Sequence, residues 1–169
     1  MKNDSLITQK KELIEKIGVN LEKLEKLAPV AARIFATLIL SKKRGVTFEA
    51  LVEELNASKS SISTHLESLQ NLKKVSYITR PGDRKRYFII HPNLILNIIN
   101  EMVDKWDNEK SIHQDIIEYK EIQKQNSEED ELEFDMEFNK DFLVFLEEAK
   151  TAIEKLKLNI IQKSTNKNQ

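Results

Sequence analysis

The stretch "SKSSISTHLESL", residues 58–69, combines a regular apolar spacing with a concentration of hydroxyl side chains. Ile62, Leu66 and Leu69 recur at steps of four and three residues, which is the spacing of one buried helix face. The remaining positions include the hydroxyl residues Ser58, Ser60, Ser61, Ser63 and Thr64. Serine and threonine each cost about 0.5 kcal/mol relative to alanine inside a helix. The pattern therefore predicts a helix whose exposed side uses short hydroxyl groups.

The residues before this stretch predict a helix-turn-helix. "FEALVEEL" (48–55) is a short amphipathic helix with Thr47 as its N-cap, "NA" (56–57) is a tight turn, and Ser58 caps the next helix. Upstream, Pro29 suits the first turn of a helix that continues through "VAARIFATLIL" (30–40). That segment is apolar on nearly every side, apart from Arg33, so we expect it at the centre of the domain.

The residues after the hydroxyl-rich helix predict a β-hairpin. "VSYITR" (75–80) and "RKRYFII" (84–90) are rich in β-branched and aromatic residues, and "PGD" (81–83) between them is a turn signal. A helix-turn-helix followed by such a hairpin is a winged helix. The predicted fold class is thus mainly α with a small β-hairpin wing (α+β).

Composition supports a helical protein with a local cationic surface. The chain has 169 residues, a net charge of −1, 33% charged residues, and only three glycines and three prolines. Residues 58–90 nevertheless carry seven Lys and Arg side chains against two acidic ones. Such a concentration of positive charge indicates a local anion-binding face in an otherwise acidic protein.

The flanking regions predict further helices. Residues 4–27 form an amphipathic pattern, a second helical region opens at Pro92, and a polar, acidic connection occupies 124–133. The last helix carries a heptad-like apolar seam of Phe138, Phe142, Phe145, Ala149, Ala152, Leu156 and Ile160. We therefore divide the chain into a dimerisation or support helix (1–28), the winged helix (29–91), C-terminal dimerisation helices (92–163) and a flexible tail (164–169).

Several classes of protein are not expected. The sequence has no cysteine, no Ser-His-Asp pattern and no glycine-rich phosphate loop, so we predict no enzyme and no cofactor. Its three histidines are far apart, which predicts no metal site. No apolar run approaches the roughly 18 residues of a membrane span, and the first residues lack the apolar region of a signal peptide. We expect a cytoplasmic protein without a membrane partner.

The hydroxyl-rich helix suits the DNA major groove. A recognition helix buries one side and presents short, hydrogen-bonding residues near its N-terminus to bases and phosphates. The predicted contacts of this helix are Ser58, Lys59, Ser60, Ser61, Ser63 and Thr64. The predicted contacts of the wing with the flanking DNA backbone are Arg80, Arg84, Lys85 and Arg86. Double-stranded DNA is therefore the expected partner.

Residues 27–90 also resemble a known family. The "ARIFATLILS" helix, the "SKSSISTHLESL" stretch and the wing "PGDRKRYF" look like MarR-type winged-helix regulators, closest to the GbsR-like branch. The resemblance implies a homodimeric transcriptional regulator, a repressor responsive to a small effector, with N- and C-terminal helices from both chains at the dimer interface. Two recognition helices about one helical turn apart would read a pseudo-palindromic operator.

The sequence departs from that family after the recognition helix. Lys73 and Lys74 stand where the family usually has a glycine followed by an aliphatic residue. A lysine in the left-handed conformation is strained by roughly 1 kcal/mol. Either the helix ends differently here, or two additional cations lie near the DNA.

Some features of the sequence have a second interpretation. Trp106 and Tyr119 could frame an aromatic pocket for an effector, although aromatic residues at helical spacing are more often core or dimer seam. The acidic run from Glu128 to Glu137 could attract a basic partner, although a solvated linker is favoured. The alternative function is a winged-helix assembly subunit that binds proteins and no DNA.

Overall fold

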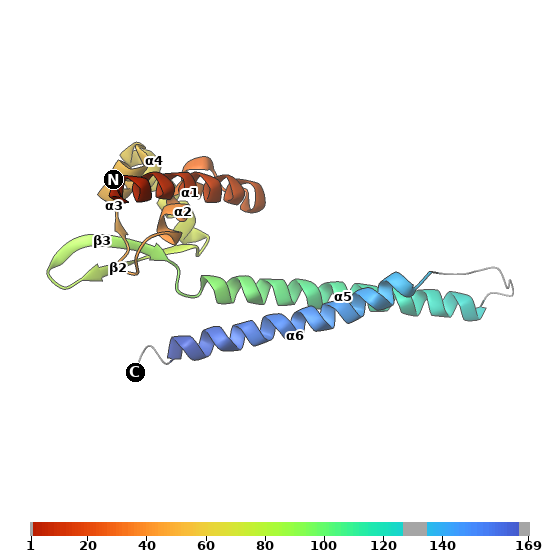
Figure 1. Cartoon of the computed structure of the whole chain (residues 1–169). Helices are drawn as coiled ribbons and strands as arrows, with labels where there is room; N and C mark the ends of the chain where they lie inside the picture. Colours follow the sequence, from red (N-terminus) through yellow and green to blue (C-terminus); the bar gives the residue numbers. More distant parts are fainter. Residues whose placement is uncertain (1, 127–134, 166–169) are drawn as a thin grey trace. The chain divides into compact units, whose positions relative to one another are not determined.

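The chain forms two compact units, Met1–Leu94 and Ile95–Gln169, in the computed structural model (Figure 1). The structure describes residues 2–126 and 135–165. The first unit contains α1 (Lys2–Glu25), α2 (Pro29–Ile39), β1 (Val46–Thr47), α3 (Phe48–Leu55), α4 (Lys59–Asn71), β2 (Val75–Arg80) and β3 (Asp83–Ile90). The second consists of α5 (Leu94–Asn126), which begins at the boundary, and α6 (Glu137–Thr165). The fold is thus mainly helical with a small antiparallel sheet.

Helix α2 occupies the core of the first unit, as its nearly all-round apolar sequence predicts. Its buried residues are Ala31, Ala32, Ile34, Phe35, Ala36, Thr37 and Leu38. Around it, the other helices and the sheet contribute the buried residues Leu51, Ile62, Leu66, Leu69, Val75 and Phe88. Burying one Leu, Ile, Val or Phe side chain contributes about 1.5–3 kcal/mol. This cluster is therefore the main source of stability for the unit.

The predicted helix starts are confirmed by their hydrogen bonds. The amide of Ala50 donates to Thr47 Oγ1 over 3.3 Å at the start of α3. The amide of Ser61 donates to Ser58 Oγ over 3.1 Å at the start of α4. Each side chain replaces a missing intrahelical partner, so the two helices begin at fixed residues. Asn56 ends α3 in the left-handed conformation, which asparagine tolerates, and this produces the turn of the helix-turn-helix.

The sheet has three strands in the order β1-β3-β2. The hairpin was predicted, and its register pairs Val75 with Ile90 and Tyr77 with Phe88. The third strand was not predicted, because β1 is only two residues long and has no alternating pattern to detect. Gly45 allows β1 to approach β3. A Cβ atom on Gly45 would lie 2.8 Å from the Phe88 carbonyl oxygen, and its φ of +75° favours glycine.

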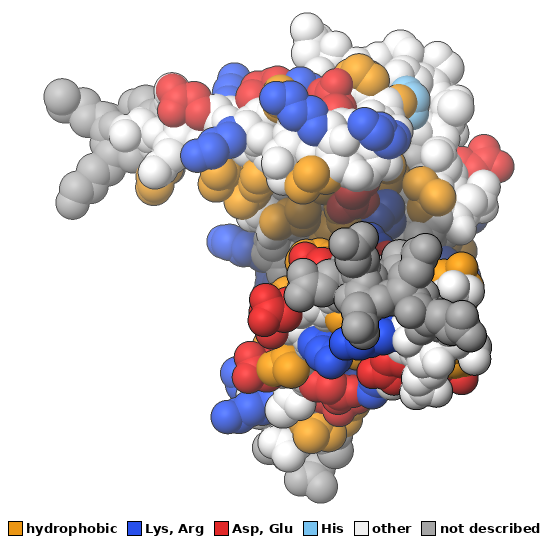
Figure 2. Space-filling view, turned by 90° about the vertical axis from the view of Figure 1, so that its right-hand side faces the viewer, with side chains coloured by type: hydrophobic (Ala, Val, Ile, Leu, Met, Phe, Trp, Pro, Cys, Tyr) orange, Lys and Arg blue, Asp and Glu red, His pale blue; other side chains and the backbone are white. Residues whose placement is uncertain are grey.

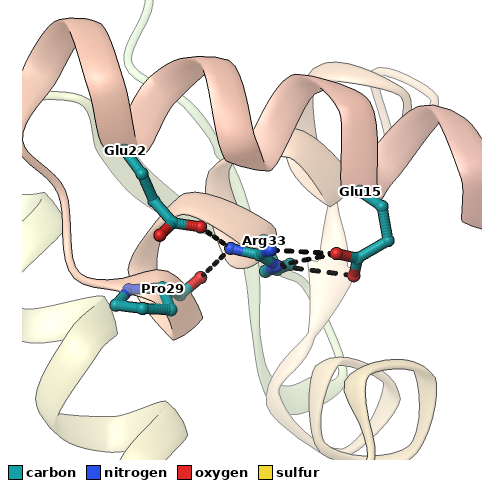
Figure 3. Close-up of polar contacts among 4 residues, drawn as sticks. All are labelled: Glu15, Glu22, Pro29 and Arg33. Carbon is teal, nitrogen blue, oxygen red and sulfur yellow. Dashed lines mark hydrogen bonds and ion pairs between the residues drawn. The ribbon is translucent and has the colours of Figure 1, made fainter.

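Acidic, basic and hydrophobic side chains are interspersed on the face shown in Figure 2. At the surface of the first unit, Arg33 is the only charged residue of α2, and it anchors α1 (Figure 3). Its Nη2 atom lies 2.9 Å from Glu15 Oε2, it also pairs with Glu22, and its Nη1 donates to the Pro29 carbonyl over 3.2 Å. The hydrogen bonds from Arg33 to Glu15 and Glu22 raise the pKa of its guanidinium. The contact thus fixes a permanently charged group between two helices.

Gly18 of α1 faces this guanidinium. A Cβ atom at Gly18 would lie 3.4 Å from Arg33 Cζ, at the limit of ordinary contact. Glycine usually weakens a helix interior by roughly 1 kcal/mol relative to alanine. Since a contact of 3.4 Å is an ordinary van der Waals one, the space beside Arg33 does not by itself require a glycine here.

The end of α4 explains the departure at Lys73 and Lys74. The amide of Lys73 donates to the Gln70 carbonyl and the amide of Lys74 to the Leu69 carbonyl, each over 2.9 Å. This is a Schellman motif, and Lys73 takes the left-handed position with a φ of 53°. The side chain of Lys74 pairs with Glu25 of α1. Only Lys73 therefore adds an exposed cation, while Lys74 ties the helix end to α1.

In the second unit, α5 and α6 run antiparallel and are joined by polar contacts. Lys150 Nζ lies 2.6 Å from Asp107 Oδ1, and Lys110 pairs with Glu147. The hydrogen bond from Lys110 lowers the pKa of the Glu147 carboxyl.

Two predicted boundaries in this unit need correction. Helix α5 extends to Asn126 and α6 to Thr165, so residues 124–126 and 164–165 are helical rather than part of a connection or a tail. Both helices continue because no proline or glycine interrupts them there. Most of the acidic run and the remainder of the tail, residues 127–134 and 166–169, lie outside the described residues. Within the described ranges, no helix combines the length and apolarity needed to cross a membrane.

We predict that Lys73→Gly stabilises the protein by about 1 kcal/mol, because glycine adopts the left-handed conformation without the clash of a Cβ atom. Urea unfolding followed by circular dichroism measures the change. Lys42→Gly is the control, since Lys42 is not among the described residues with positive φ, and it should lower stability. Equal effects of the two substitutions would contradict the assignment of strain to Lys73.

Candidate nucleic-acid interface

The N-terminus of α4 is an exposed group of hydroxyls and amides. Ser58 Oγ lies 3.0 Å from Ser60 Oγ and accepts a hydrogen bond from the Ser61 amide. The first intrahelical bond is donated by Ile62 to the Ser58 carbonyl, so the amides of Lys59 and Ser60 precede the helical hydrogen bonds. Free amides and the positive end of the helix dipole make this end suited to an anion.

The predicted recognition residues lie on the side of α4 that faces away from the core. Ile62, Leu66 and Leu69 are buried. Exposed residues on the opposite side are Ser58, Lys59, Ser60, Ser63 and Thr64, and Ser61 is half-buried. The apolar and hydroxyl sides therefore separate as the spacing in the sequence predicts.

A groove of about 590 Å³ is lined by both α4 and the wing. The wing is β2, β3 and the turn between them, and we call this groove the α4–wing groove. Its lining residues are Phe48 and Glu49 of α3, Ser63, Leu66, Glu67 and Gln70 of α4, and Arg84, Lys85, Arg86 and Phe88 of β3. Ser63, from the predicted recognition set, thus lines the same groove as three predicted wing cations.

Aromatic side chains position one of these cations. The guanidinium of Arg86 lies over the ring of Tyr77, 4.6 Å from its centroid. Tyr77 in turn meets Phe88 edge-to-face, with ring centroids 6.3 Å apart. Since Phe88 is buried, this stack connects Arg86 to the core. A cation held over a ring keeps its charge while losing freedom of movement.

Arg80 has a different environment from the other wing cations. Its Nη2 atom donates to the Arg44 carbonyl over 2.7 Å, and its guanidinium lies 3.7 Å from the centroid of Tyr87. A register irregularity between Ile78 and Arg80 places Arg80 opposite Asp83 at the end of the hairpin. Arg80 therefore joins the wing to the loop before β1 and does not line the α4–wing groove described above.

Asp83 organises the tip of the wing. Its carboxylate accepts a hydrogen bond from the Tyr87 hydroxyl over 2.5 Å and another from the Lys85 amide over 2.9 Å. These two bonds lower the pKa of Asp83. The bond between the Tyr87 hydroxyl and the Asp83 carboxylate also raises the pKa of Tyr87. A carboxyl with a depressed pKa stabilises the fold when ionised. Its contribution is present above its ordinary pKa of about 3.9 and is lost as the pH falls through the lower folded value.

The predicted dimer seam on α6 is partly covered within its own chain. Phe142 lies 4.6 Å from His113 of α5 between ring centroids, and the Nδ2 atom of Asn139 is 2.8 Å from His113 Nδ1. Phe142 and Ala149 are half-buried. In contrast, Phe138, Phe145 and Leu156 are 66%, 54% and 47% exposed. Phe138 and Phe145 stack against Phe142 on either side, so these seam residues are covered only in part by the described chain.

The two aromatic residues considered for an effector do not come together. Trp106 and Tyr119 are both on α5, and thirteen residues of helix separate them by about 20 Å. The cavity beside Tyr119 is lined by Ile112, Asp115, Ile116, Tyr119 and Lys120. Trp106 does not line it. Among the described residues, no group of three His, Asp or Glu side chains is placed to hold a metal ion.

Several residues of this interface are not among those predicted from the sequence. Glu67 and Gln70 follow Ser63 at steps of four and three, so the helical spacing already placed them on its side of α4. Tyr77 and Tyr87 act as platforms for Arg86 and Arg80, which only the strand register reveals.

Comparisons with known proteins show similarity in fold. No protein-family model and no curated protein sequence matches the chain. Among solved structures, the chain is similar to the crystal structure of a transcriptional regulator, with a TM-score of 0.50 and 17% sequence identity. The match covers 93% of this chain and 99% of the other. At this identity the likeness is one of fold, and function has to be argued from the site.

We predict that Tyr87→Phe raises the pKa of Asp83 towards its ordinary value, because it removes the hydroxyl donor and keeps the ring under Arg80. Carboxyl chemical shifts followed by NMR during acid titration measure this pKa. Tyr77→Phe is the control, since the Tyr77 hydroxyl is not a partner of Asp83, and it should leave the Asp83 pKa unchanged.

Proposed function

We propose that this chain is a transcriptional regulator that binds double-stranded DNA in a sequence-specific manner, as a MarR-type winged-helix protein of the GbsR-like branch. One observation carries the proposal. Ser63, on the exposed hydroxyl side of α4, lines one groove together with the β3 cations Arg84, Lys85 and Arg86. A recognition helix in the major groove and a wing on the adjacent backbone require this combination.

The contacts divide into two kinds. Arg84, Lys85 and Arg86 bind phosphates, because guanidinium and ammonium groups form charge-assisted hydrogen bonds that do not depend on sequence. Ser63 and Thr64 contact base edges, since short hydroxyls both donate and accept. The N-terminal amides of α4 add a contact to the backbone of the DNA.

The proposed active form is a homodimer. Exposed apolar residues on α6 support it, because Phe138, Phe145 and Leu156 keep roughly half or more of their surface exposed in the single chain. A two-fold dimer presents two copies of α4 and so requires a pseudo-palindromic operator. Occupying such an operator blocks transcription, which makes repression the simplest mode of action. An effector is implied by the family resemblance alone, because Trp106 and Tyr119 lie about 20 Å apart along α5.

We predict that Arg84→Ala combined with Lys85→Ala weakens binding to every duplex and flattens its salt dependence. Each protomer would lose two phosphate contacts, so the slope of log K against log salt should fall by about 3–4 for a dimer. Fluorescence anisotropy of the full chain on labelled DNA from upstream of its own gene, at several salt concentrations, measures the slope. Lys105→Ala with Lys155→Ala, two exposed lysines of the second unit, is the charge-matched control and should change the slope little.

Ser63→Ala provides the complementary result in the same experiment. It should reduce the preference for the native duplex over a scrambled one while leaving the salt slope in place. If the unmodified protein binds neither duplex at low salt, the regulator proposal is wrong. The protein-interaction subunit then becomes the better explanation of the winged helix.

We predict that Phe145→Glu combined with Leu156→Glu converts the dimer into monomers, since each change places a charge in an apolar interface. Light scattering coupled to size exclusion gives the mass. Asn159→Glu, at an exposed polar position of the same helix, should leave the dimer intact. An unchanged dimer mass for the double variant would place the interface elsewhere.

A further inference from the structure

One acidic side chain of α4 lies among the wing cations without a partner. Glu67 lines the α4–wing groove together with Arg84, Lys85 and Arg86. Other acidic residues of the first unit do pair with cations, as Glu25 does with Lys74 and Glu15 with Arg33. Within residues 2–126 and 135–165, however, the Glu67 carboxylate has no hydrogen bond and no ion pair.

Such a residue opposes the proposed function unless it makes a specific contact. A carboxylate facing DNA is repelled by the phosphates, and the repulsion acts on every sequence. The neighbouring Glu49 has a structural explanation, because it lies in the first turn of α3, where the helix dipole favours an acid. Glu67 is in the second half of α4 and has no such explanation.

The DNA groups that a carboxylate can accept from are amino groups on base edges. In the major groove these are the N4 amino group of cytosine and the N6 amino group of adenine, and Glu or Asp pairs characteristically with cytosine. Glu67 is one helical turn beyond Ser63, about 6 Å along the axis. At about 3.4 Å per base step, this separation places it within two base pairs of the base that Ser63 contacts.

We infer that Glu67 is a specificity-determining residue that accepts a hydrogen bond from a cytosine amino group in each half-site. The inference rests on the proposed DNA-binding function. Repulsion from the phosphates lowers affinity for all duplexes, and the cytosine contact restores it only where the correct base is present. Glu67 therefore increases the difference between operator and other DNA rather than the affinity itself.

The test begins with the full chain and a library of randomised duplexes, from which the preferred sequence is selected. Anisotropy then compares the selected duplex with versions that carry each of the other three base pairs at every half-site position. Wild-type protein should discriminate about tenfold at one position that carries cytosine. Glu67→Ala should abolish discrimination at that position alone and increase affinity for the non-cognate duplexes.

Glu49→Gln is the matched control, because it removes the other acid of the same groove. It should increase binding to all duplexes by a similar factor and leave base preferences unchanged. The inference is overturned if Glu67→Ala acts in this same uniform way. Failure of the wild-type protein to bind any duplex would instead overturn the proposed function itself.

Discussion

Burial of α2 is the constraint on which the first unit depends. A helix that is apolar on nearly every side exposes its surface to water unless other elements cover it from several directions. Helices α1, α3 and α4 and the sheet provide that cover, and their positions follow from it. Ile62, Leu66 and Leu69 hold α4 by one side only, so its opposite side is directed towards solvent. The hydroxyl surface is thus a consequence of how the core is built.

A second set of contacts, among the side chains of the wing itself, holds its cations in place. Tyr77 and Tyr87 each support an arginine on their ring, and Asp83 closes the tip through Tyr87 and the Lys85 amide. Positive charges placed close together repel one another, and rings and carboxylates offset that repulsion without removing the charge. Arg80 donates to the Arg44 carbonyl and so ties the wing to the loop before β1. Arg84, Lys85 and Arg86 instead line the α4–wing groove. A cationic surface of fixed geometry is what a proposed phosphate contact requires.

Positive charge in the first unit serves two different purposes. Arg33 and Lys74 are paired with acids of α1 and hold the unit together, whereas the groove cations lack such partners among the described residues. The same comparison applies to acids. Glu15, Glu22 and Glu25 have cationic partners, and Glu67 has none in the part of the chain that the structure describes. Arg33 and Lys74 thus use their charge to hold α1, whereas the charged residues that line the α4–wing groove have no ion-pair partner among the described residues.

The sequence by itself determined the local elements of this protein. Pro29 and a nearly all-round apolar segment predicted α2, and apolar spacing predicted α4. The Thr47 and Ser58 caps were evident from residue type, and the proline-glycine pair marked the hairpin turn. These features are local because they depend on residues a few positions apart. Only the tertiary structure decided which cations face the groove, that Lys74 binds Glu25 and that β1 adds to the sheet. Those outcomes depend on strand register and on contacts between distant segments, which no periodicity within one segment encodes.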